Sequence, residues 1–532
     1  MPLLELRDLH VRYPGEHAVR GVNLTVDSGE TLGLAGESGC GKSTLAMSVL
    51  RLLPATAEVS GQVLFDGDDV REMNWGRLRA VRWAGASVVF QGAMHALNPV
   101  HRVGDQIAEP IRLHTPATSP AEVRRRVAAL LEQVELPAER AQAYPHELSG
   151  GQKQRVMIAM ALACEPRLVI ADEPTTALDV VVQAQVLGVL TRLVAERGIG
   201  LLFISHDLSV LSATCERLAV MHRGEIVEQG PARAVIANPT HPHTQALAAA
   251  FPTVGDQRFR YAPATTGDPI EAGTIGEDLL RVEGLTVDYG RHRAVDNVDL
   301  TVRAGEIVAL VGQSGSGKTT LARTILGLQA PTAGRILFDD TPMPTSSSGL
   351  RRYRRQVQLV LQDPTSALNP RHSVHEAVAE GLRIHRVPGD ESELVAAALD
   401  AAELRPPERY TAALPHALSG GQRQRVVIAG ALALAPRLLV ADEPVASLDA
   451  SVRGEILALL LRLRANLGLA ALVITHDLGV AWTIADRVAV MHQGRLVEVG
   501  PVDQVLGDPR HPYTQTLLAA ITPLGGSPTA TV

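Results

Sequence analysis

Two glycine-rich segments of the sequence have the spacing of a loop that binds phosphate groups. They read GESGCGKST from Gly36 to Thr44 and GQSGSGKTT from Gly312 to Thr320, and both satisfy G-x-x-x-x-G-K-[ST]. Each follows a short apolar run and precedes a segment that is compatible with a helix. Glycines let successive backbone N–H groups turn inward around phosphate oxygens, and the helix N-terminus adds partial positive charge. We therefore predict two nucleotide-binding loops.

Equivalent positions of the two loops carry the predicted phosphate and magnesium contacts. Lys42 and Lys318 would reach the β- and γ-phosphates, and the hydroxyls of Ser43 and Thr319 would ligate Mg²⁺. Only three of the 50 Lys and Arg residues are lysines, and the loops hold two of them. A compact ammonium fits two adjacent phosphates better than the planar guanidinium of arginine does. The remaining predicted nucleotide contacts are Gly36, Gly39, Gly41, Thr44, Gly312, Gly315, Gly317 and Thr320.

Paired carboxylates end two apolar runs, LVIADE and LLVADE. Asp172 and Asp442 would orient Mg²⁺, and the following Glu173 and Glu443 would polarise the water that attacks the γ-phosphate. A strand-end carboxylate that caps the following turn is the alternative interpretation. Because the pair follows a phosphate loop twice in one chain, the catalytic interpretation is favoured.

Histidines end the next apolar runs, LLFISH and ALVITH. His206 and His476 each follow their glutamate by 33 residues. A lone histidine at a strand end is more often structural, but the repeated spacing favours hydrogen bonds to the γ-phosphate and the attacking water.

The chain is a tandem repeat of one domain. The offset between equivalent residues is 276 for the two loop lysines and 270 for Asp172 and Asp442, as it is for the two histidines. A near-constant offset over the whole length predicts two copies, which we place at residues 1–252 and 278–532. The stretch 253–277 is rich in Gly, Pro, Thr and Ala and lacks apolar periodicity, so we interpret it as a linker. Buried-type strands that end in functional groups predict an α/β fold with a largely parallel sheet.

Composition excludes several classes of protein. The 532 residues are too many for one ordinary domain, and the formal charge of −7 gives no support for binding nucleic acid. Three cysteines, Cys40, Cys164 and Cys215, cannot build a disulfide framework or a four-cysteine metal site. The longest apolar runs are about half the roughly 20 residues that a spanning helix needs, and the N-terminus has no signal-peptide pattern. We expect a cytoplasmic protein.

LSGGQ occurs at Leu148–Gln152 and again at Leu418–Gln422, just upstream of each Asp-Glu pair. This motif set resembles the ATPases of ABC transporters over essentially the whole chain. The resemblance implies two tandem P-loop NTPase domains of the ABC type, each with a mainly parallel sheet core, an antiparallel β subdomain and a helical subdomain. It also implies that the halves pair, with ATP between the loop of one half and the signature of the other. The signature residues are Ser149, Gly150, Gly151 and Gln152, and Ser419, Gly420, Gly421 and Gln422.

Further positions follow from the same resemblance. Tyr13 and Tyr289 look like the aromatic residue that stacks on adenine. Gln91 and Gln362 look like the glutamine that touches Mg²⁺ and the attacking water, and Asp179 and Asp449 look like the D-loop that couples the two sites. The segment after Gln91 reads GAMHALNP, where the second copy has DPTSALNP, so the membrane-side contact of the first half is expected to differ. Neither copy lacks a catalytic residue, so we predict two competent sites.

HPHTQ and HPYTQ near the end of each half resemble the ATPases of dipeptide, oligopeptide and nickel importers. The resemblance implies two membrane permease subunits and an extracytoplasmic solute-binding protein as partners, ATP and Mg²⁺ as cofactors, and a peripheral location on the inner face of the membrane. Some relatives carry an iron–sulfur centre in this region, but no cysteine follows Cys215, so we expect none. His241 and His511 are shared by the copies whereas His243 is replaced by Tyr513, which argues against metal ligation there.

A soluble twin-ATPase translation factor that acts on ribosomes is the alternative. Such factors resemble this chain in lacking membrane spans, but they carry a long, charged helical linker between their halves. The linker here is short and weakly charged, and the two LNP segments favour the importer.

Overall fold

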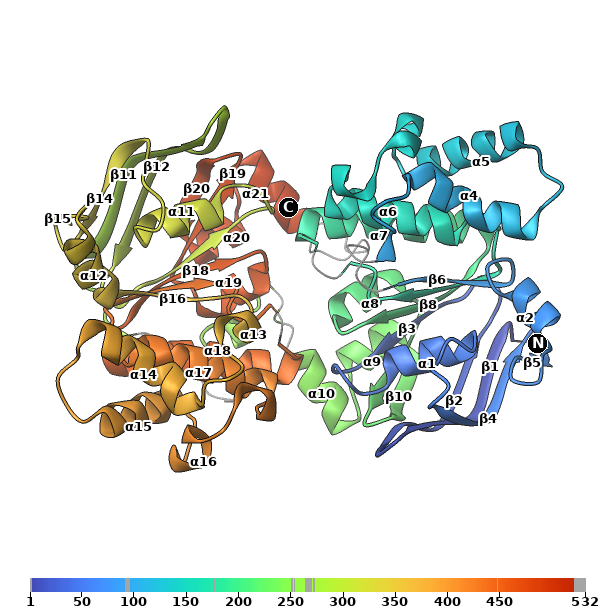
Figure 1. The fold of residues 1–532 in the computed structure, drawn as a ribbon, viewed down its shortest axis with the longest axis horizontal. Coiled ribbons are helices and arrows are strands. Elements are labelled where there is room, and N and C mark those ends of the chain that lie inside the picture. The colour runs from blue at the N-terminus through green and yellow to red at the C-terminus, as the bar shows by residue number, and fades with distance from the viewer. Residues whose placement is uncertain are drawn as a thin grey trace, which may run out of the picture. The chain divides into compact units, whose positions relative to one another are not determined.

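The computed structural model describes residues 2–520, except 91–95, 176–177, 250–251, 253, 264–269, 271–272 and 447. The bulk of the chain forms two compact units, Met1–Phe251 and Pro252–Ala519, each of which is described by itself (Figure 1).

The first unit alternates strands and helices along the chain. Its strands are β1 (Leu4–Tyr13), β2 (Glu16–Val26), β3 (Thr31–Ala35), β4 (Glu58–Phe65), β5 (Asp68–Asp69), β6 (Ala86–Val89), β7 (Leu168–Asp172), β8 (Gly200–Ser205), β9 (Arg217–His222) and β10 (Glu225–Pro231). Its helices are α1 (Lys42–Val49), α2 (Trp75–Val81), α4 (Val103–His114), α5 (Pro120–Gln133), α6 (Gly150–Ala161), α7 (Val180–Arg197), α8 (Leu208–Thr214), α9 (Ala232–Ala237) and α10 (Pro242–Ala249).

The second unit repeats this order of elements. Its strands are β11 (Asp278–Tyr289), β12 (His292–Arg303), β13 (Ile307–Val311), β14 (Ala333–Phe338), β15 (Thr341–Pro342), β16 (Val357–Val360), β17 (Leu438–Asp442), β18 (Ala470–Thr475), β19 (Arg487–His492) and β20 (Arg495–Pro501). Its helices are α11 (Lys318–Ile325), α12 (Ser347–Gln356), α13 (Pro364–Ala367), α14 (Val374–His385), α15 (Glu391–Ala401), α16 (Glu408–Thr411), α17 (Gly420–Leu432), α18 (Ala450–Leu467), α19 (Leu478–Ile484), α20 (Val502–Gly507) and α21 (Pro512–Ala519).

Each unit contains a six-stranded sheet and a four-stranded sheet. The six-stranded sheets have the orders β10-β9-β3-β8-β7-β6 and β16-β17-β18-β13-β19-β20, and all their pairings are parallel except those of β10 and β20 at one edge. The smaller sheets, β2-β1-β4-β5 and β12-β11-β14-β15, are antiparallel. Helices cover the parallel strands, which explains why β7, β8, β13 and β18 are apolar runs without alternation. The predicted fold class is confirmed.

One hydrophobic core in each unit joins the two sheets. In the first unit, side chains of β1, β2 and β4 cluster with Leu32 of β3, Leu45 of α1 and Leu202 of β8. The second unit repeats this cluster with β11, β12 and β14. Figure 1 shows the antiparallel strands on one side of the parallel sheet and the helices α4 and α5, or α14 and α15, on the other. Residues of α1 and α11 belong to these cores, which anchors the C-terminal end of the loop that precedes each helix.

The segment that follows Pro252 packs against the second unit. The Trp482 indole donates to the carbonyl of Asp256 at 2.9 Å, and the Tyr261 hydroxyl donates to Asp486 at 2.7 Å. Arg464, which is 2% exposed, forms an ion pair with the same Asp486 at 3.1 Å. Part of the segment interpreted as a linker is therefore an ordered extension of the second unit.

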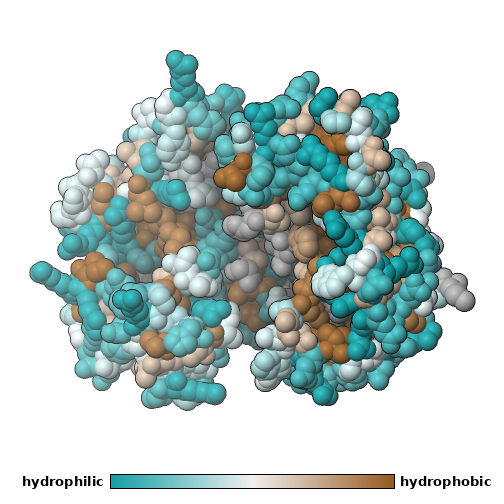
Figure 2. Space-filling model, turned by 45° about the vertical axis from the view of Figure 1, so that its right-hand side comes forward, coloured by the Kyte–Doolittle hydropathy of each residue, from teal (hydrophilic) through white to brown (hydrophobic). Residues whose placement is uncertain are grey.

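No described helix is both long and apolar enough to cross a membrane. Hydrophilic side chains cover most of the face shown in Figure 2, and hydrophobic ones lie in separate patches.

Candidate functional site

The first phosphate loop joins β3 to α1 in a conformation that requires its glycines. Gly36 has φ 154° and Gly41 has φ 106°. A Cβ at Gly36 would lie 2.4 Å from the Met221 carbonyl, and one at Gly41 would lie 2.2 Å from the Ala18 carbonyl. Strands β9 and β2 thus pack directly on the loop, and a larger residue would displace it.

Lys42 lies at the end of this loop and is only 5% exposed. Its Nζ donates to the carbonyls of Gly36 and Glu37, both at 2.7 Å. Lys318 makes the same two bonds in the second loop, to Gly312 at 2.7 Å and to Gln313 at 2.8 Å. The charge of each buried ammonium is therefore balanced by carbonyl dipoles, which a nucleotide phosphate can replace.

The strand-end aspartates lie beside the loop hydroxyls, as predicted for a Mg²⁺ site. Ser43 hydrogen-bonds to Asp172, and Thr319 hydrogen-bonds to Asp442. Burial and the adjacent glutamate raise the pKa of both aspartates, although the hydroxyls and the loop lysines act in the opposite direction. Oδ1 of Asp172 is buried with no hydrogen-bond partner among the described residues. The carboxylate of Asp172 therefore has an oxygen without a hydrogen-bond partner, and it lies beside the exposed hydroxyl of Ser43. Oxygen ligands of this kind are the ones that Mg²⁺ prefers.

The predicted catalytic glutamates face the predicted histidines. His476 Nδ1 lies 2.8 Å from Oε1 of Glu443, and His206 Nδ1 lies 3.2 Å from Oε1 of Glu173. In the second unit, Gln362 also donates to Oε2 of Glu443 at 2.7 Å. Gln91, which is its counterpart, lies outside the described residues together with Gly92 and Ala93.

Backbone pairing holds the two glutamates in this position. The N–H of Glu173 donates to the Ile204 carbonyl of β8 at 3.0 Å, and the N–H of Glu443 donates to the Ile474 carbonyl of β18 at 2.8 Å. Both glutamates have positive φ, 45° and 47°. Such a conformation is costly for a residue with a Cβ, and it is typical of positions where a side chain must be aimed at a site.

The parallel register brings these groups to one edge of the sheet. Ala35, just before the first loop, pairs with Ser205, just before His206. Asp172 pairs with Ile204 on the other side of the same strand. Because the carboxyl ends of β3, β7 and β8 coincide, the loop, the carboxylates and the histidine gather at one edge of the sheet.

The predicted adenine contacts end the first strands of the antiparallel sheets. Tyr289 is 46% exposed at the end of β11, and Tyr13 is half-buried at the end of β1. Tyr289 is thus accessible to a planar ligand, whereas Tyr13 also packs against the hydrophobic core of the first unit.

The signature residues begin α6 and α17 in matching capping boxes. The Ser149 side chain accepts from the N–H of Gln152 at 3.3 Å, and the Gln152 side chain accepts from the N–H of Ser149 at 3.0 Å. Ser419 and Gln422 make the same two bonds at 3.2 and 2.9 Å. A capped helix N-terminus with two glycines presents N–H groups and partial positive charge to an anion.

The D-loop aspartates lie at the N-termini of the next long helices. Asp179 caps α7 by accepting from the N–H of Val182 at 3.1 Å, and Asp449 occupies the equivalent N-cap position of α18. Gly151 packs so closely on α7 that an added Cβ would lie 2.3 Å from Cγ1 of Val182. The signature segment at the start of α6 therefore packs directly against the helix α7 that follows the D-loop of the same half.

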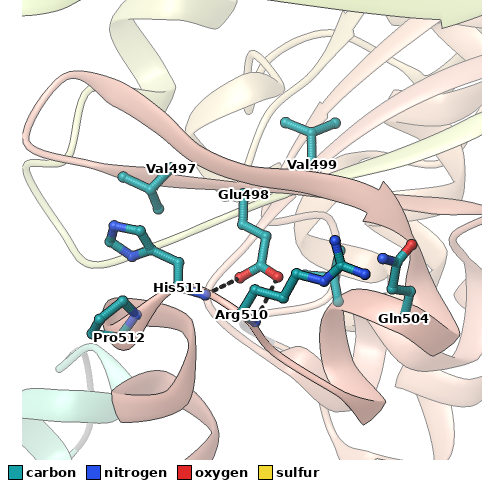
Figure 3. Close-up of a pocket in the computed structure, with 8 residues that line it drawn as sticks. Val497, Glu498, Val499, Gln504, Arg510, His511 and Pro512 are labelled. Carbon is teal, nitrogen blue, oxygen red and sulfur yellow. Dashed lines mark hydrogen bonds between the residues drawn. The ribbon is translucent and has the colours of Figure 1, made fainter.

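A partly exposed glutamate holds each HPHTQ or HPYTQ segment through backbone hydrogen bonds, which the sequence analysis did not anticipate. Glu498 accepts from the N–H groups of Arg510 and His511 at 2.9 and 3.1 Å (Figure 3). These residues line an open pocket of about 340 Å³ with Val497, Val499, Gln504, Val505 and Pro512. Glu228 accepts equivalent bonds from Thr240 and His241. Burial alone would raise the pKa of Glu228, but these hydrogen bonds lower it to about 2.

A signal for these carboxylates is present in the sequence. Glu228 and Glu498 are 270 residues apart, the offset of the whole second part of the repeat. Each glutamate precedes its histidine segment by a dozen residues and belongs to no motif used in the sequence analysis. The repeat therefore marks the two glutamates as equivalent, but the fold is needed to show that they hold the histidine segments.

Cys40 is a buried packing residue of the first loop. Burial raises the pKa of its thiol despite the nearby Lys42. A protonated thiol in this position is a poor nucleophile.

The fold and the site define a nucleotide-binding ATPase with a glycine-rich loop, a capped Ser-Gly-Gly-Gln helix and a strand-end Asp-Glu pair in each half. The family described as "ABC transporter" matches residues 19–176 and 295–446, and the chain belongs to this family. The family described as "Oligopeptide/dipeptide transporter, C-terminal region" matches residues 227–276 and 497–530. Each half is thus an ABC-type ATP-binding domain, and the chain is an ATPase.

The chain is similar to proteins named "Glutathione import ATP-binding protein GsiA". It is 42% identical to the protein from Salmonella choleraesuis strain SC-B67 over 544 residues, which cover 95% of this chain and 86% of that one. The protein from Escherichia coli strain K12 is also 42% identical, over 543 residues with the same coverage. Among solved structures, cbiO1 from Clostridium perfringens, part of the ABC transporter complex cbiONQ, is 33% identical with a TM-score of 0.41, and covers 44% of this chain and 92% of its own.

Proposed function

We propose that this chain is the ATP-hydrolysing subunit of an importer for peptides or a similar small solute such as glutathione. The match of both C-terminal segments to the oligopeptide/dipeptide transporter region carries this proposal, since it distinguishes the chain from other twin ATPases. The names of the relatives agree with it and favour a peptide-like solute over nickel. The partners would be two membrane permeases and an extracytoplasmic solute-binding protein, with the chain on the inner face of the membrane.

The proposed domains are residues 1–252 and 278–532, and the described part of the intervening residues 253–277 packs on the second unit. ATP would bring the two halves together, with the loop of each facing the signature of the other. The capping boxes of α6 and α17 support this, because they leave N–H groups at capped helix N-termini for a phosphate. Closure would drive the permeases, and hydrolysis would reset them.

The residues of each half would act on the γ-phosphate in defined roles. Lys42 and Lys318 would leave their carbonyl partners and bind the β- and γ-phosphates, while the glycines of the loops contribute N–H groups. Mg²⁺ held by Ser43, Gln91 and Asp172, or by Thr319, Gln362 and Asp442, would neutralise the phosphate oxygens. Tyr13 and Tyr289 would stack on adenine.

Glu173 and Glu443 would accept the proton of the attacking water. His206 and His476, hydrogen-bonded to these glutamates, would hold each carboxylate in place and donate to the γ-phosphate. Asp179 and Asp449 would transmit the state of one site to the other through α7 and α18.

Affinity purification of the chain from membranes of its host tests the importer assignment. We expect two permeases to be recovered with it, and ATP hydrolysis to rise when solute and binding protein are added. Recovery with ribosomes, and without permeases, would support the translation-factor alternative and overturn the importer.

A further inference from the structure

Three side chains that the proposed hydrolysis does not use converge beside the first phosphate loop. Glu37 is the second residue of that loop, His222 ends β9, and His243 lies in the first turn of α10. One carboxylate oxygen and one nitrogen of each imidazole lie within 4.8 Å of one another. Among the residues that the structure describes, this is the one cluster of three or more His, Cys, Asp or Glu side chains with such spacing.

The backbone around the three side chains is fixed from several directions. The Met221 carbonyl packs against Gly36, which places the end of β9 beside the loop. The N–H of His243 donates to Nδ1 of His241 at 3.1 Å, and Glu228 accepts from the N–H of His241 at 3.0 Å. The ring centroids of His222 and His243 lie 3.9 Å apart. The backbone that carries the three side chains is therefore held in place before any ion arrives.

The electrostatics of the cluster favour a cation with an affinity for nitrogen. Nδ1 of His222 and Nε2 of His243 are buried and have no hydrogen-bond partner among the described residues. Neutral imidazoles keep a lone pair for a metal, and leaving such nitrogens buried without a partner costs free energy.

The second half fills the equivalent space differently. Glu37 corresponds to Gln313, His222 to His492 and His243 to Tyr513. The Tyr513 hydroxyl accepts from the N–H of Gln313 at 3.0 Å, and its ring stacks on His492 at 3.8 Å. One half is closed by a hydrogen bond and a ring stack, whereas the other gathers three metal-ligand groups. This arrangement of the three side chains therefore distinguishes the first half from the second.

We propose that Glu37, His222 and His243 bind one divalent transition-metal ion, for which Zn²⁺ is the best match. Two imidazoles and one carboxylate suit Zn²⁺ and its neighbours, with water in the fourth position, whereas Mg²⁺ and Ca²⁺ require oxygen ligands. The ion would tie the first loop to β9 and α10. Because the Glu37 carbonyl holds Lys42, the first ATP site, and not the second, would then respond to the metal. This last consequence rests on the proposed function, whereas metal binding itself does not.

Titration of the full-length, chelator-treated chain with Co²⁺ or Zn²⁺, in the absence of nucleotide, tests the proposal. We expect one ion per chain, visible Co²⁺ absorption of a four-coordinate site, and a rise in Tm that a chelator reverses. Glu37→Gln and His243→Tyr import the residues of the second half, so the fold is expected to accept them. Each should weaken binding beyond the roughly 10–100-fold that loss of an outer-shell partner causes.

His492→Gln is the matched control, since His492 is the counterpart of His222 in the second half. It should keep the ion at wild-type affinity. Circular dichroism of each variant reports whether the fold is intact. Binding of equal strength in the wild type, Glu37→Gln and His243→Tyr would show adventitious histidine sites only, and would overturn the proposal. Absence of Co²⁺ absorption and of a Tm rise in the wild type would do so as well.

Discussion

The imidazole Nδ1 of His476 lies 2.8 Å from Oε1 of Glu443, and each residue changes the charge state of the other. Burial alone would lower the pKa of His476, but Glu443 raises it above 6.5. Burial alone would raise the pKa of Glu443, but His476 lowers it below 4.5. A charged histidine thus lies beside a charged glutamate over a range of pH that includes weakly acidic conditions.

This pair makes the stability of the second half depend on pH. The contribution of His476 is complete below its unfolded pKa of 6.5 and is lost as pH rises through its raised pKa. The contribution of Glu443 is complete above 4.5 and is lost as pH falls through its lowered pKa. The pair therefore stabilises most between pH 4.5 and 6.5.

We expect His476→Asn to lower Tm most in that window, and its deficit to shrink as pH rises through the raised pKa of His476. The His476 side chain is 34% exposed, so solvent screens the pair and the effect should stay within about 1 kcal/mol. Thermal unfolding of both proteins at several pH values measures it. His206→Asn, which removes the equivalent imidazole at the 3.2 Å contact of the first half, is the comparison variant. A deficit that is constant with pH would contradict the ion pair.

The two loop lysines should not tolerate arginine. Lys42→Arg and Lys318→Arg place a planar guanidinium where a compact ammonium lies, with its Nζ 2.7–2.8 Å from two carbonyl oxygens. Fluorescent ATP binding should weaken about tenfold to a hundredfold, as expected for a loss of about 1.5–3 kcal/mol of charged hydrogen bonding. Lys153→Arg is the matched control, because the second half has Arg423 there. Equal binding by Lys42→Arg and Lys153→Arg would show that the ammonium is not required.

The second signature glycine is required for packing as well as for any contact with phosphate. Gly421→Ala would place a Cβ 2.3 Å from Cγ1 of Val452, and such overpacking costs about 1–3 kcal/mol. Gly420→Ala is the control, since its Cβ would lie 3.7 Å from Leu448, an ordinary contact. Urea unfolding should separate the two variants, and Val452→Ala should restore stability to Gly421→Ala. A loss of stability equal to that of Gly420→Ala would contradict the close approach of α17 and α18.

Repetition explains how much of the site could be predicted from the sequence. Lys42, Asp172, Glu173 and His206 each end or follow an apolar run, and each recurs in the second half, so the parallel register had to bring them together. The capping boxes were equally visible as Ser-Gly-Gly-Gln. All of these depend on contacts that are local or are dictated by strand ends.

The rest depends on contacts between distant segments that carry no pattern. Glu37, His222 and His243 meet only because β9 packs on the loop and Glu228 holds the start of α10. Comparison of the copies argued against a metal at His243, because the second copy has tyrosine there. Once Glu37 and His222 are known to lie beside His243, the same difference indicates a feature that distinguishes the first half from the second. The hydrogen bond from Tyr261 to Asp486 could not be predicted, because Tyr261 lies in a stretch without apolar periodicity.

Turnover of ATP by glutamate variants tests the central claim most directly, namely two competent sites that use Glu173 and Glu443 as bases. Steady-state phosphate release and ATP retention are measured for the wild type, Glu173→Gln, Glu443→Gln and the double variant. We expect similar losses in the single variants. The double variant should lose about 10²–10⁴-fold, the usual contribution of a general base, while it still retains bound ATP. Near-normal hydrolysis by the double variant would contradict the account.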